Sequence, residues 1–404
     1  MRYLLLIVVC VIFPLFVAFP LDYRVTSTPI FLNSLIVGAL SPLAAYTSIR
    51  NLSKFPGERS WMSMQPVVIL WFGFFALMVM LLRIPHSVVY LVTGFIFCVV
   101  FVQIDYKINE AQKKMKIGYV PLGRAEGAEE LPHALWIRMD KPTLDVGDVD
   151  AVVADLHSKD LSIEWQRFLA QCTLNHIPVY NIRQIEESLT GRVKIRHMYE
   201  NDLGSLLPSE TYSFIKRVCE SALVVLALPL VLPIMLVTAA AIRIESRGAV
   251  IFTQRRVGQF GEEFTIYKFR SMASDSEKNG ARFASKDDFR VTRVGRFIRK
   301  TRIDELPQFF NVLKGDMALI GPRPEQKVFV EEFEKLIPFY SYRHVVKPGI
   351  TGWAQVEHGY AADADETQVK IEHDFYYIKN FSFGLDWLIV VKTIYTMMTG
   401  FGAR

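Results

Sequence analysis

The first quarter of the chain contains four long apolar stretches, each close to the length that crosses the hydrocarbon core of a membrane. Few charges interrupt them, so we expect four transmembrane helices within residues 1–110. A cleaved signal peptide is an alternative interpretation of the first stretch, but no small-residue cleavage site stands out before Leu21 and more apolar segments follow. The four stretches are residues 3–20, 30–45, 67–82 and 88–104.

Residues 115–207 show a soluble pattern, in which short apolar runs alternate with helix-like segments such as residues 162–175. This alternation predicts a small Rossmann-like α/β module with a parallel sheet. Gly118, Gly123 and Gly127 follow the first run, but their spacing differs from the GxGxxG fingerprint of dinucleotide-binding proteins. The pattern therefore favours a structural or assembly module over a nucleotide site. The apolar runs are residues 117–120, 134–137, 151–154 and 177–180.

A fifth long apolar segment, residues 218–242, differs from the first four because Pro229 and Pro233 stand at its middle. A proline inside a helix removes a backbone hydrogen bond and bends the helix. Cations flank both ends, which favours the same side of the membrane for each. We therefore expect a re-entrant helix that turns at Pro229 and returns to the cytosolic face, and a fifth full span is the alternative. The flanking cations are Lys216, Arg217, Arg243 and Arg247.

Basic and aromatic residues are interleaved in residues 252–272, where alternating apolar positions predict strand-like or short interfacial pieces. Such a surface beside a membrane suits lipid headgroups or a diphosphate. We do not expect nucleic acid as a partner, because these residues follow a membrane-inserted segment. The last apolar stretch, residues 385–399, contains Lys392 and predicts an interfacial helix.

Composition agrees with a membrane protein, since 51% of the 404 residues are hydrophobic, more than a soluble chain of two or three domains usually contains. The distribution of loop cations predicts that the N-terminus and everything after Ile104 lie in the cytosol. The four cysteines are scattered and indicate neither a disulfide framework nor a zinc site. The cytosolic loop cations are Arg50, Lys54, Arg59, Lys107, Lys113, Lys114 and Lys116, against Arg24 and Arg83 in the other two connections.

The strongest candidate for chemistry is residues 293–325, where a basic run meets two adjacent carboxylates, Asp304 and Glu305. At helical spacing three cations would share a face with Asp304, and cations so close favour an ionised carboxylate. Pro307 and Gly315 fit the first turn and the end of a helix, so the acidic pair would lie at a helix N-terminus that attracts phosphate. The alternative is that Asp304 is only an N-cap and the basic run a solvated or lipid-facing surface. The three cations are Arg293, Arg296 and Lys300.

Five motifs follow one another in the C-terminal half: KRVCES, YKFRSM, IRKTRIDELPQFFNVLKGDMALIGPRPE, KPGITGWAQV and HDFYYIKNFSFGLDW. With these motifs the chain from Tyr212 to Arg404 resembles the bacterial sugar transferases called monotopic polyprenyl-phosphate phosphoglycosyl transferases, which start capsule, exopolysaccharide and O-antigen assembly. The four spans and the α/β module resemble the N-terminal half of the large forms. The resemblance implies a largely helical monotopic catalytic domain over residues 212–404, on the cytosolic face of the bacterial inner membrane.

The resemblance also implies a reaction, the transfer of a sugar 1-phosphate from a nucleotide sugar, expected to be a UDP-sugar, to undecaprenyl phosphate or a similar polyprenyl phosphate. A nucleoside monophosphate is released. Asp304 matches the family's nucleophile, which forms a covalent phosphosugar intermediate, and Glu305 matches its acidic partner. Mg²⁺ is the expected cofactor, held near Asp304. The expected substrate-binding residues are Lys268, Arg270, Arg299, Arg302, Arg323 and Glu325.

The chain departs from the family pattern at four places. Glu220 stands where Asp is usual, Leu228 where Ser is common before Pro229, and Ala318 where Ser is usual. The sequence EHGY, residues 357–360, replaces a frequent NGR near the expected sugar pocket, so the identity of the sugar stays open.

The likeness to the large forms predicts a homodimer. Two other classes of function remain open. A membrane assembly protein would not need Asp304 for chemistry, and a Rossmann-type membrane enzyme such as a dehydratase would need a bound dinucleotide, against which the absent GxGxxG argues.

Overall fold

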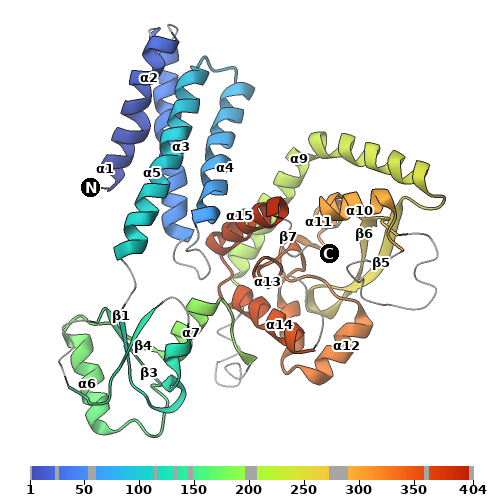
Figure 1. Cartoon of the computed structure of the whole chain (residues 1–404). Coiled ribbons are helices and arrows are strands. Elements are labelled where there is room, and N and C mark those ends of the chain that lie inside the picture. The colour runs from blue at the N-terminus through green and yellow to red at the C-terminus, as the bar shows by residue number, and fades with distance from the viewer. Residues whose placement is uncertain are drawn as a thin grey trace. The chain divides into compact units, whose positions relative to one another are not determined.

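The computed structural model describes residues 2–22, 27–52, 61–112, 116–131, 134–143, 149–195, 207–272, 290–358 and 364–399. Contacts within the chain form two compact units, Met1–Gly191 and Arg192–Arg404 (Figure 1). Several residues used above lie outside the described residues, namely the loop cations Arg24, Lys54, Arg59, Lys113 and Lys114, and Tyr360 of the EHGY sequence.

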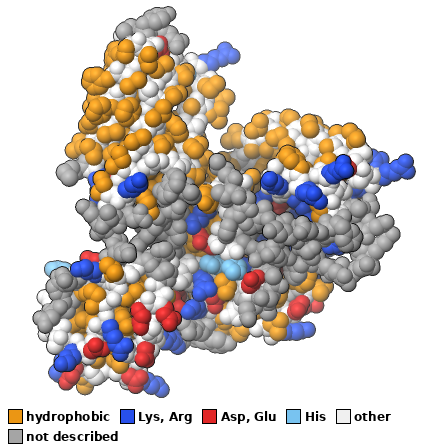
Figure 2. Space-filling model, viewed as in Figure 1, with side chains coloured by type: hydrophobic (Ala, Val, Ile, Leu, Met, Phe, Trp, Pro, Cys, Tyr) orange, Lys and Arg blue, Asp and Glu red, His pale blue; other side chains and the backbone are white. Residues whose placement is uncertain are grey.

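The first unit begins with apolar helices. α1 (Arg2–Ile7), the π-helical turn η1 (Val8–Ile12) and α2 (Phe13–Leu21) follow one another, and α3 (Thr28–Leu52), α4 (Trp61–Leu81) and α5 (Val88–Gln112) come next. Each of these four helical segments is long and apolar enough to cross a membrane, and Figure 2 shows hydrophobic side chains over most of their visible surface. The four apolar helices predicted from the sequence are present.

Three buried polar residues of these helices are joined by hydrogen bonds, as an apolar environment favours. The Ser87 hydroxyl donates to Asp22 Oδ2 at 2.7 Å, and the Ser87 backbone N–H donates to Ser34 Oγ at 2.9 Å. All three residues are buried. These contacts join the end of α2, the first half of α3 and the start of α5.

The α/β module of the first unit has four parallel strands, β1 (Lys116–Tyr119), β2 (Leu135–Arg138), β3 (Ala151–Ala154) and β4 (Val179–Asn181), in the order β2-β1-β3-β4. β3 is wholly buried, which explains its continuous apolar run. The helices α6 (Ile163–Leu174) and α7 (Ile182–Thr190) follow β3 and β4, and Ser162 and Asn181 cap them. The predicted parallel α/β module is confirmed.

The carboxyl ends of β1 and β3 meet where ligands bind in many open α/β sheets. Here the module's own side chains fill that place. A Cβ on Gly123 would lie 2.8 Å from Asp155 Oδ2 and 2.9 Å from Ser158 Oγ. The Asp155 carboxylate accepts from the backbone N–H groups of Arg124 and His157. This arrangement agrees with a structural module.

The second unit contains the long helix α9 (Glu210–Glu245), the antiparallel hairpin of β5 (Ile251–Val257) and β6 (Glu263–Phe269), and the parallel pair β7 (Ala318–Ile320) and β8 (Gly349–Thr351). Around them lie α10 (Arg293–Lys300), α11 (Gln308–Lys314), α12 (Lys327–Leu336), the 3₁₀ helix η8 (Tyr340–Val345), α13 (Trp353–Glu357), α14 (Ala364–Lys379) and α15 (Phe383–Thr399).

The helix α9 is continuous over 36 residues and includes both Pro229 and Pro233. Figure 1 shows that its two ends run in different directions, so the helix bends without a break. Prolines in the interior of a helix cause such bends. α9 is also long and apolar enough to be a membrane span. Its exposed leucines include Leu226, Leu230 and Leu236, at 70–76% exposure. Figure 2 shows hydrophobic side chains gathered over α9 with Lys and Arg beside them.

A buried polar network holds the first turns of α9 to the rest of the unit. Lys216 pairs with Glu220 at 2.7 Å and with Asp386 of α15. Tyr377 donates to Asp386 at 2.8 Å. The Glu220 carboxylate accepts from the backbone N–H groups of Leu319, at 3.0 Å, and Ile320, at 3.2 Å. Glu220, one of the departures from the family pattern, therefore links α9 to β7.

Two predictions about the second unit differ from the structure, one about its first residues and one about its last helix. The α/β module was expected to extend to residue 207, whereas Val193 and Ile195 are buried against α14, with the Val193 N–H donating to the Glu372 carbonyl at 3.0 Å. The prediction that the helix over residues 385–399 is interfacial is wrong. Leu385 and Leu388 are fully buried, so α15 is a core helix whose apolar side faces protein.

Candidate active site

The acidic pair lies on a short turn between α10 and α11. α10 ends at Lys300, and Arg302 then adopts a left-handed backbone conformation with φ of 55°. The 3₁₀ turn η7 (Ile303–Glu305) follows and carries Asp304 and Glu305. The predicted helical face that Asp304 would share with three cations of α10 is therefore wrong, because the left-handed residue ends the helix before the carboxylates.

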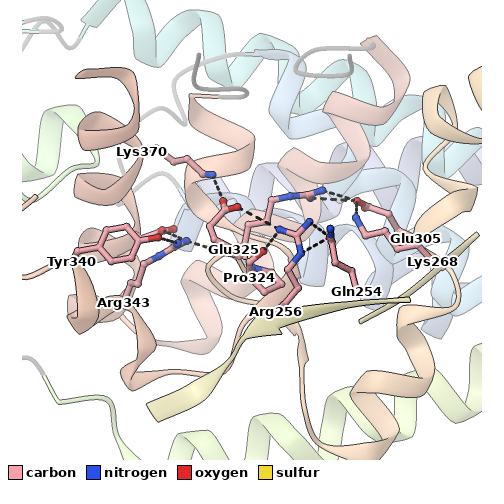
Figure 3. A network of polar contacts seen from close by, with 11 residues as sticks. Gln254, Arg256, Lys268, Glu305, Pro324, Glu325, Tyr340, Arg343 and Lys370 are labelled. Atoms are coloured by element: carbon pink, nitrogen blue, oxygen red, sulfur yellow. Dashed lines mark hydrogen bonds and ion pairs between the residues drawn. The ribbon is translucent and has the colours of Figure 1, made fainter. Parts of the chain in front are cut away.

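Glu305 lies at the centre of an ion-pair cluster (Figure 3). Lys268, near the end of β6, places Nζ 3.5 Å from Oε1, and Arg323, after β7, places Nη2 3.2 Å from the same oxygen. Arg302 Nη1 lies 3.5 Å from Oε2. Glu305 is only 7% exposed, so these charges interact with little screening by water. The structure thus brings four predicted site residues together from three separate segments.

The two carboxylates have different acidities. Burial alone would raise the pKa of Glu305, but Arg323, Lys268 and Arg302 outweigh it and lower the pKa to about 2. Burial and the charge of Glu305 raise the pKa of Asp304 to about 6, although nearby cations oppose this. The cations favour the ionised form of both carboxylates, as predicted, but at Asp304 burial and the charge of Glu305 outweigh them.

Lys268 is affected by the same surroundings. Burial and repulsion by Arg323 lower the pKa of Lys268 to about 8, although Glu305 and Asp304 favour its charged form. The lysine therefore still carries its charge at neutral pH.

Arg299 approaches the acidic pair from α10. Its Nε donates to Ser271 Oγ at 2.8 Å, and its charge counteracts the raised pKa of Asp304. The position of α10 depends on Gly295, because a Cβ there would lie 2.0 Å from the Ser271 carbonyl oxygen. A glycine in this helix thus permits the close packing that places Arg299.

Arg270, also predicted to bind substrate, has contacts elsewhere. It donates to the carbonyl oxygens of Ser246, at 2.9 Å, and Arg247, at 3.1 Å. These carbonyls follow the end of α9, where helices leave acceptors unsatisfied. The recorded contacts of Arg270 hold the end of α9 and do not involve the acidic pair.

Glu325 forms a second cluster next to the first. Lys370 Nζ lies 2.8 Å from its Oε1 and Arg256 Nη1 lies 3.6 Å from its Oε2 (Figure 3). Burial would raise the pKa of Glu325, but Lys370, Arg343 and Arg256 outweigh it and lower the pKa to about 2. The Val257 N–H donates to the Glu325 carbonyl at 2.9 Å. These contacts fix the segment that carries Arg323.

Arg343 connects the two clusters and was not predicted. One guanidinium nitrogen donates to the Arg323 carbonyl at 2.9 Å and to Asp374 at 2.8 Å, and the other donates to the Tyr340 hydroxyl at 2.9 Å. Arg343 and Asp374 are both buried. A signal for them exists in the sequence, since a charged residue inside the aromatic runs YSYRHV and HDFYY needs a buried partner.

The helix predicted to follow the acidic pair is present, but four backbone N–H groups around its start are already paired. α11 has seven residues, and its N-cap is Pro307, so the interpretation of Asp304 as an N-cap is wrong. Four backbone N–H groups of this turn donate to backbone carbonyls instead of facing a ligand. They belong to Glu305, Leu306, Phe309 and Phe310. Cationic side chains contribute to the positive field at the pair.

Asp304 remains available for a cation or for substrate. Within the described residues, no hydrogen bond or ion pair to its carboxylate is recorded, and no group of three His, Cys, Asp or Glu side chains encloses a metal. Mg²⁺ in proteins often takes one or two carboxylates and completes its shell with water and substrate phosphates. Asp304 fits such a site, because a divalent cation would offset the negative charge that raises its pKa.

A separate cavity of about 780 Å³ lies at the turn of the β5–β6 hairpin, between α12 and η8. Phe260, Phe339 and His344 are among its lining residues. Asp304 and Glu305 do not line it, so this cavity and the acidic pair are distinct features of the second unit.

Comparison with known proteins matches residues 211–400 to the family described as bacterial sugar transferase. A UDP-N-acetylgalactosamine-undecaprenyl-phosphate N-acetylgalactosaminephosphotransferase of Aeromonas hydrophila is 55% identical over 351 residues, which cover 87% of this chain and 83% of that protein. A UDP-glucose:undecaprenyl-phosphate glucose-1-phosphate transferase of Klebsiella pneumoniae is 35% identical over 260 residues, 62% of this chain and 54% of that protein. The transferase of the same name from Escherichia coli K12 is 41% identical over 230 residues, 55% of this chain and 48% of that protein.

Proposed function

Because the chain belongs to the bacterial sugar transferase family, and is a transferase as its relatives are, we propose that it moves a sugar 1-phosphate from a UDP-sugar to undecaprenyl phosphate and releases UMP. UDP-N-acetylgalactosamine is the proposed donor, since the relative named for it matches most of both chains. UDP-glucose is the second candidate, supported by relatives that match smaller shares.

The unequal surroundings of the acidic pair carry the proposed mechanism. Glu305 is held by Lys268, Arg302 and Arg323, whereas no such partner is recorded for Asp304 in the described residues. A nucleophile must be free to leave its ground-state contacts, and a carboxylate with a pKa of about 6 is mostly ionised at neutral pH. Asp304 is therefore the proposed nucleophile and Glu305 the residue that fixes the cations around it.

In the first proposed step, an Asp304 oxygen attacks the phosphorus next to the sugar. The bond from this phosphorus to the bridging oxygen of the diphosphate breaks, and UMP leaves with that oxygen. In the second step, an oxygen of undecaprenyl phosphate attacks the same phosphorus, and the bond to Asp304 breaks to restore the carboxylate. Two steps spare the site from holding two anionic substrates at once.

Lys268, Arg299 and Arg323 would stabilise the charge that develops on the phosphoryl oxygens in both steps. Lys268 and Arg323 are preorganised by their ion pairs with Glu305, so little reorganisation is needed when the substrate binds. Mg²⁺, held by Asp304, would neutralise part of the diphosphate charge.

We also propose that α9 is re-entrant and that the second unit lies on the cytosolic face of the bacterial inner membrane. The bend in α9, its two inner prolines and its exposed apolar residues support this placement. Undecaprenyl phosphate presents its phosphate at the headgroup level, and the UDP-sugar is dissolved in the cytosol. A re-entrant helix would hold the acidic pair where the two substrates meet.

The proposal is tested with full-length protein in lipid nanodiscs, UDP-sugars and Mg²⁺, with UMP release as the readout. We expect UMP from one UDP-sugar before any lipid acceptor is added, ping-pong kinetics when the acceptor is present, and an acid-labile sugar phosphate on Asp304. Asp304→Asn should abolish UMP release and the adduct together. EDTA should stop the reaction, and added Mg²⁺ should restore it.

Asp140→Asn is the matched control, because Asp140 is an exposed aspartate of the α/β module that pairs with exposed Arg138. It should behave as the wild type. Appreciable turnover by Asp304→Asn, or a strict ternary-complex rate law, would contradict the covalent step. A wild-type protein that releases no UMP from any UDP-sugar would favour the alternative of an assembly protein without catalysis.

A further inference from the structure

Gln308 is a buried polar residue that the mechanism above does not use. Its side chain is 2% exposed, and Nε2 is enclosed without a hydrogen-bond partner in the described residues. An unsatisfied buried amide costs free energy, and most buried polar groups in native proteins are paired. Such a group is a candidate for a hydrogen bond to a molecule that binds later.

The spacing of Gln308 predicts that it lies on the side of the turn that faces β6. It stands three residues after Glu305 and three residues before Asn311, and η7 runs into α11 so that the three residues share one side. Asn311 and Glu305 both contact β6. In the sequence, Gln308 therefore lies between two residues whose contacts with β6 are known.

Two contacts of neighbouring residues point to a position for Gln308 near the acidic pair. The Asn311 amide donates to the Thr265 carbonyl at 2.7 Å and accepts from the Tyr267 N–H at 3.1 Å, whereas Glu305 meets Lys268 further along the strand. By this spacing, the expected position of Gln308 is between them, next to the contact of Glu305 with Lys268. It is also four residues after Asp304, one helical turn away.

Asn311 already makes the structural contact between α11 and β6 on this side of the helix. Asn311 joins α11 to the backbone of β6 with both ends of its side-chain amide. Gln308 makes no recorded bond of this kind in the described part of the chain. The pairing of β6 with α11 therefore does not account for a carboxamide at position 308.

We propose that the Gln308 carboxamide donates a hydrogen bond to a phosphoryl oxygen of the sugar 1-phosphate while that group is held at Asp304. A carboxamide supplies two N–H donors without adding charge to a site that already contains Lys268, Arg302 and Arg323. The inference rests on the proposed function, because it requires a phosphoryl group at Asp304.

The test compares full-length wild type with Gln308→Met in nanodiscs. Methionine has a similar length and removes both donors. We expect a thermal midpoint equal to or above that of the wild type, because a buried unsatisfied group is lost. We expect kcat/KM for UMP release to fall about 10- to 100-fold, as for a lost hydrogen bond to a charged group. A gain in stability with a loss of activity is not expected of a residue that only packs.

Gln308→Glu provides a second measurement if the methionine variant fails to fold. Glutamate keeps the shape, loses the amide donors and adds negative charge beside the phosphate, so a larger fall in kcat/KM is expected. Asn311→Leu is the structural control and should lower the thermal midpoint. If Gln308→Met or Gln308→Glu releases UMP as well as an active wild type, the inference is wrong while the proposed function stands. An inactive wild type would instead overturn the proposed function.

Discussion

Asp304 and Glu305 are neighbours in the chain, yet the fold gives them different roles. In a 3₁₀ turn successive side chains point about 120° apart, so one carboxylate can face the cations while the next faces elsewhere. Glu305 is the buried partner of Lys268, Arg302 and Arg323. The sequence shows two adjacent acids, but it does not show which of them the distant Lys268 and Arg323 contact.

Glu325 supports the segment of Arg323 through charge, and we expect its contribution to depend on pH. Its folded-state pKa of about 2 lies below the unfolded value of about 4.3. Its contribution is therefore complete above pH 4.3 and is lost as the pH falls toward 2. The difference corresponds to about 3 kcal/mol of unfolding free energy.

The measurement for Glu325 is the thermal midpoint of the wild type and of Glu325→Gln between pH 7 and pH 3. Glu325→Gln should be less stable at pH 7, because Lys370 and Arg256 lose their counter-charge, and the difference from the wild type should shrink below pH 4.3. A difference that stays constant over this range would show that packing, and not charge, is what glutamine disturbs.

At the scale of secondary structure, α9 offers the clearest prediction. A straight helix of 36 residues would be about 54 Å long, well beyond the hydrocarbon core of about 30 Å. In the proposed re-entrant arrangement, the bend would keep both ends at one surface. Replacing Pro229 and Pro233 by Ala should straighten α9 and let its C-terminal end reach the periplasm in part of the molecules.

Labelling with a membrane-impermeant maleimide checks the path of α9. In a Cys219→Ser background, a cysteine at Arg247 should be labelled only from the cytosolic side, and partly from outside once both prolines are replaced. A cysteine at Arg83, in a predicted periplasmic connection, is the control for outside labelling. Periplasmic labelling at position 247 with both prolines in place would show a full fifth span.

The sequence predicts elements well where local pattern decides them. The strands of the α/β module lie within two residues of their predicted positions, because apolar runs between turns specify buried strands. Prediction was wrong where tertiary contacts decide. The sequence of α15 predicts an interfacial helix, but its apolar side packs into the core of the second unit. The predicted helical face of Asp304 is lost because Arg302 adopts a left-handed conformation, which a non-glycine residue rarely does.

At the scale of the whole molecule, the candidate site depends on segments far apart in sequence. Lys268 and Arg323 reach Glu305 across 37 and 18 positions, and the Arg343–Asp374 pair spans 31. The family resemblance identifies Lys268 and Arg323 as site residues, but it does not show how they contact Glu305. Asp374 lies in one of the family motifs and Arg343 does not, but neither binds a ligand in the proposed mechanism, and their pairing is visible only in the structure.

The likeness to the large forms, together with an α/β module whose strand ends are filled by its own side chains, predicts that this module serves assembly. We expect the full-length protein to be a homodimer in native lipid. A variant in which a flexible linker replaces residues 116–191 should be largely monomeric and should still release UMP. The deletion ends at Gly191 because Val193 and Ile195 pack against α14 of the second unit, and removing them would disturb that unit.

Native mass spectrometry and UMP release measure the two effects separately. The matched control is a longer deletion, in which the linker replaces residues 116–194 and the second unit begins at Ile195. It removes the Val193 contact to Glu372, so its thermal midpoint should fall below that of the 116–191 deletion, in which the second unit begins at Arg192. Two outcomes would contradict the assembly role. One is a full-length protein that is monomeric in native lipid at every concentration. The other is a folded 116–191 deletion that stays dimeric or releases no UMP, because the module would then be dispensable for assembly or part of the chemistry.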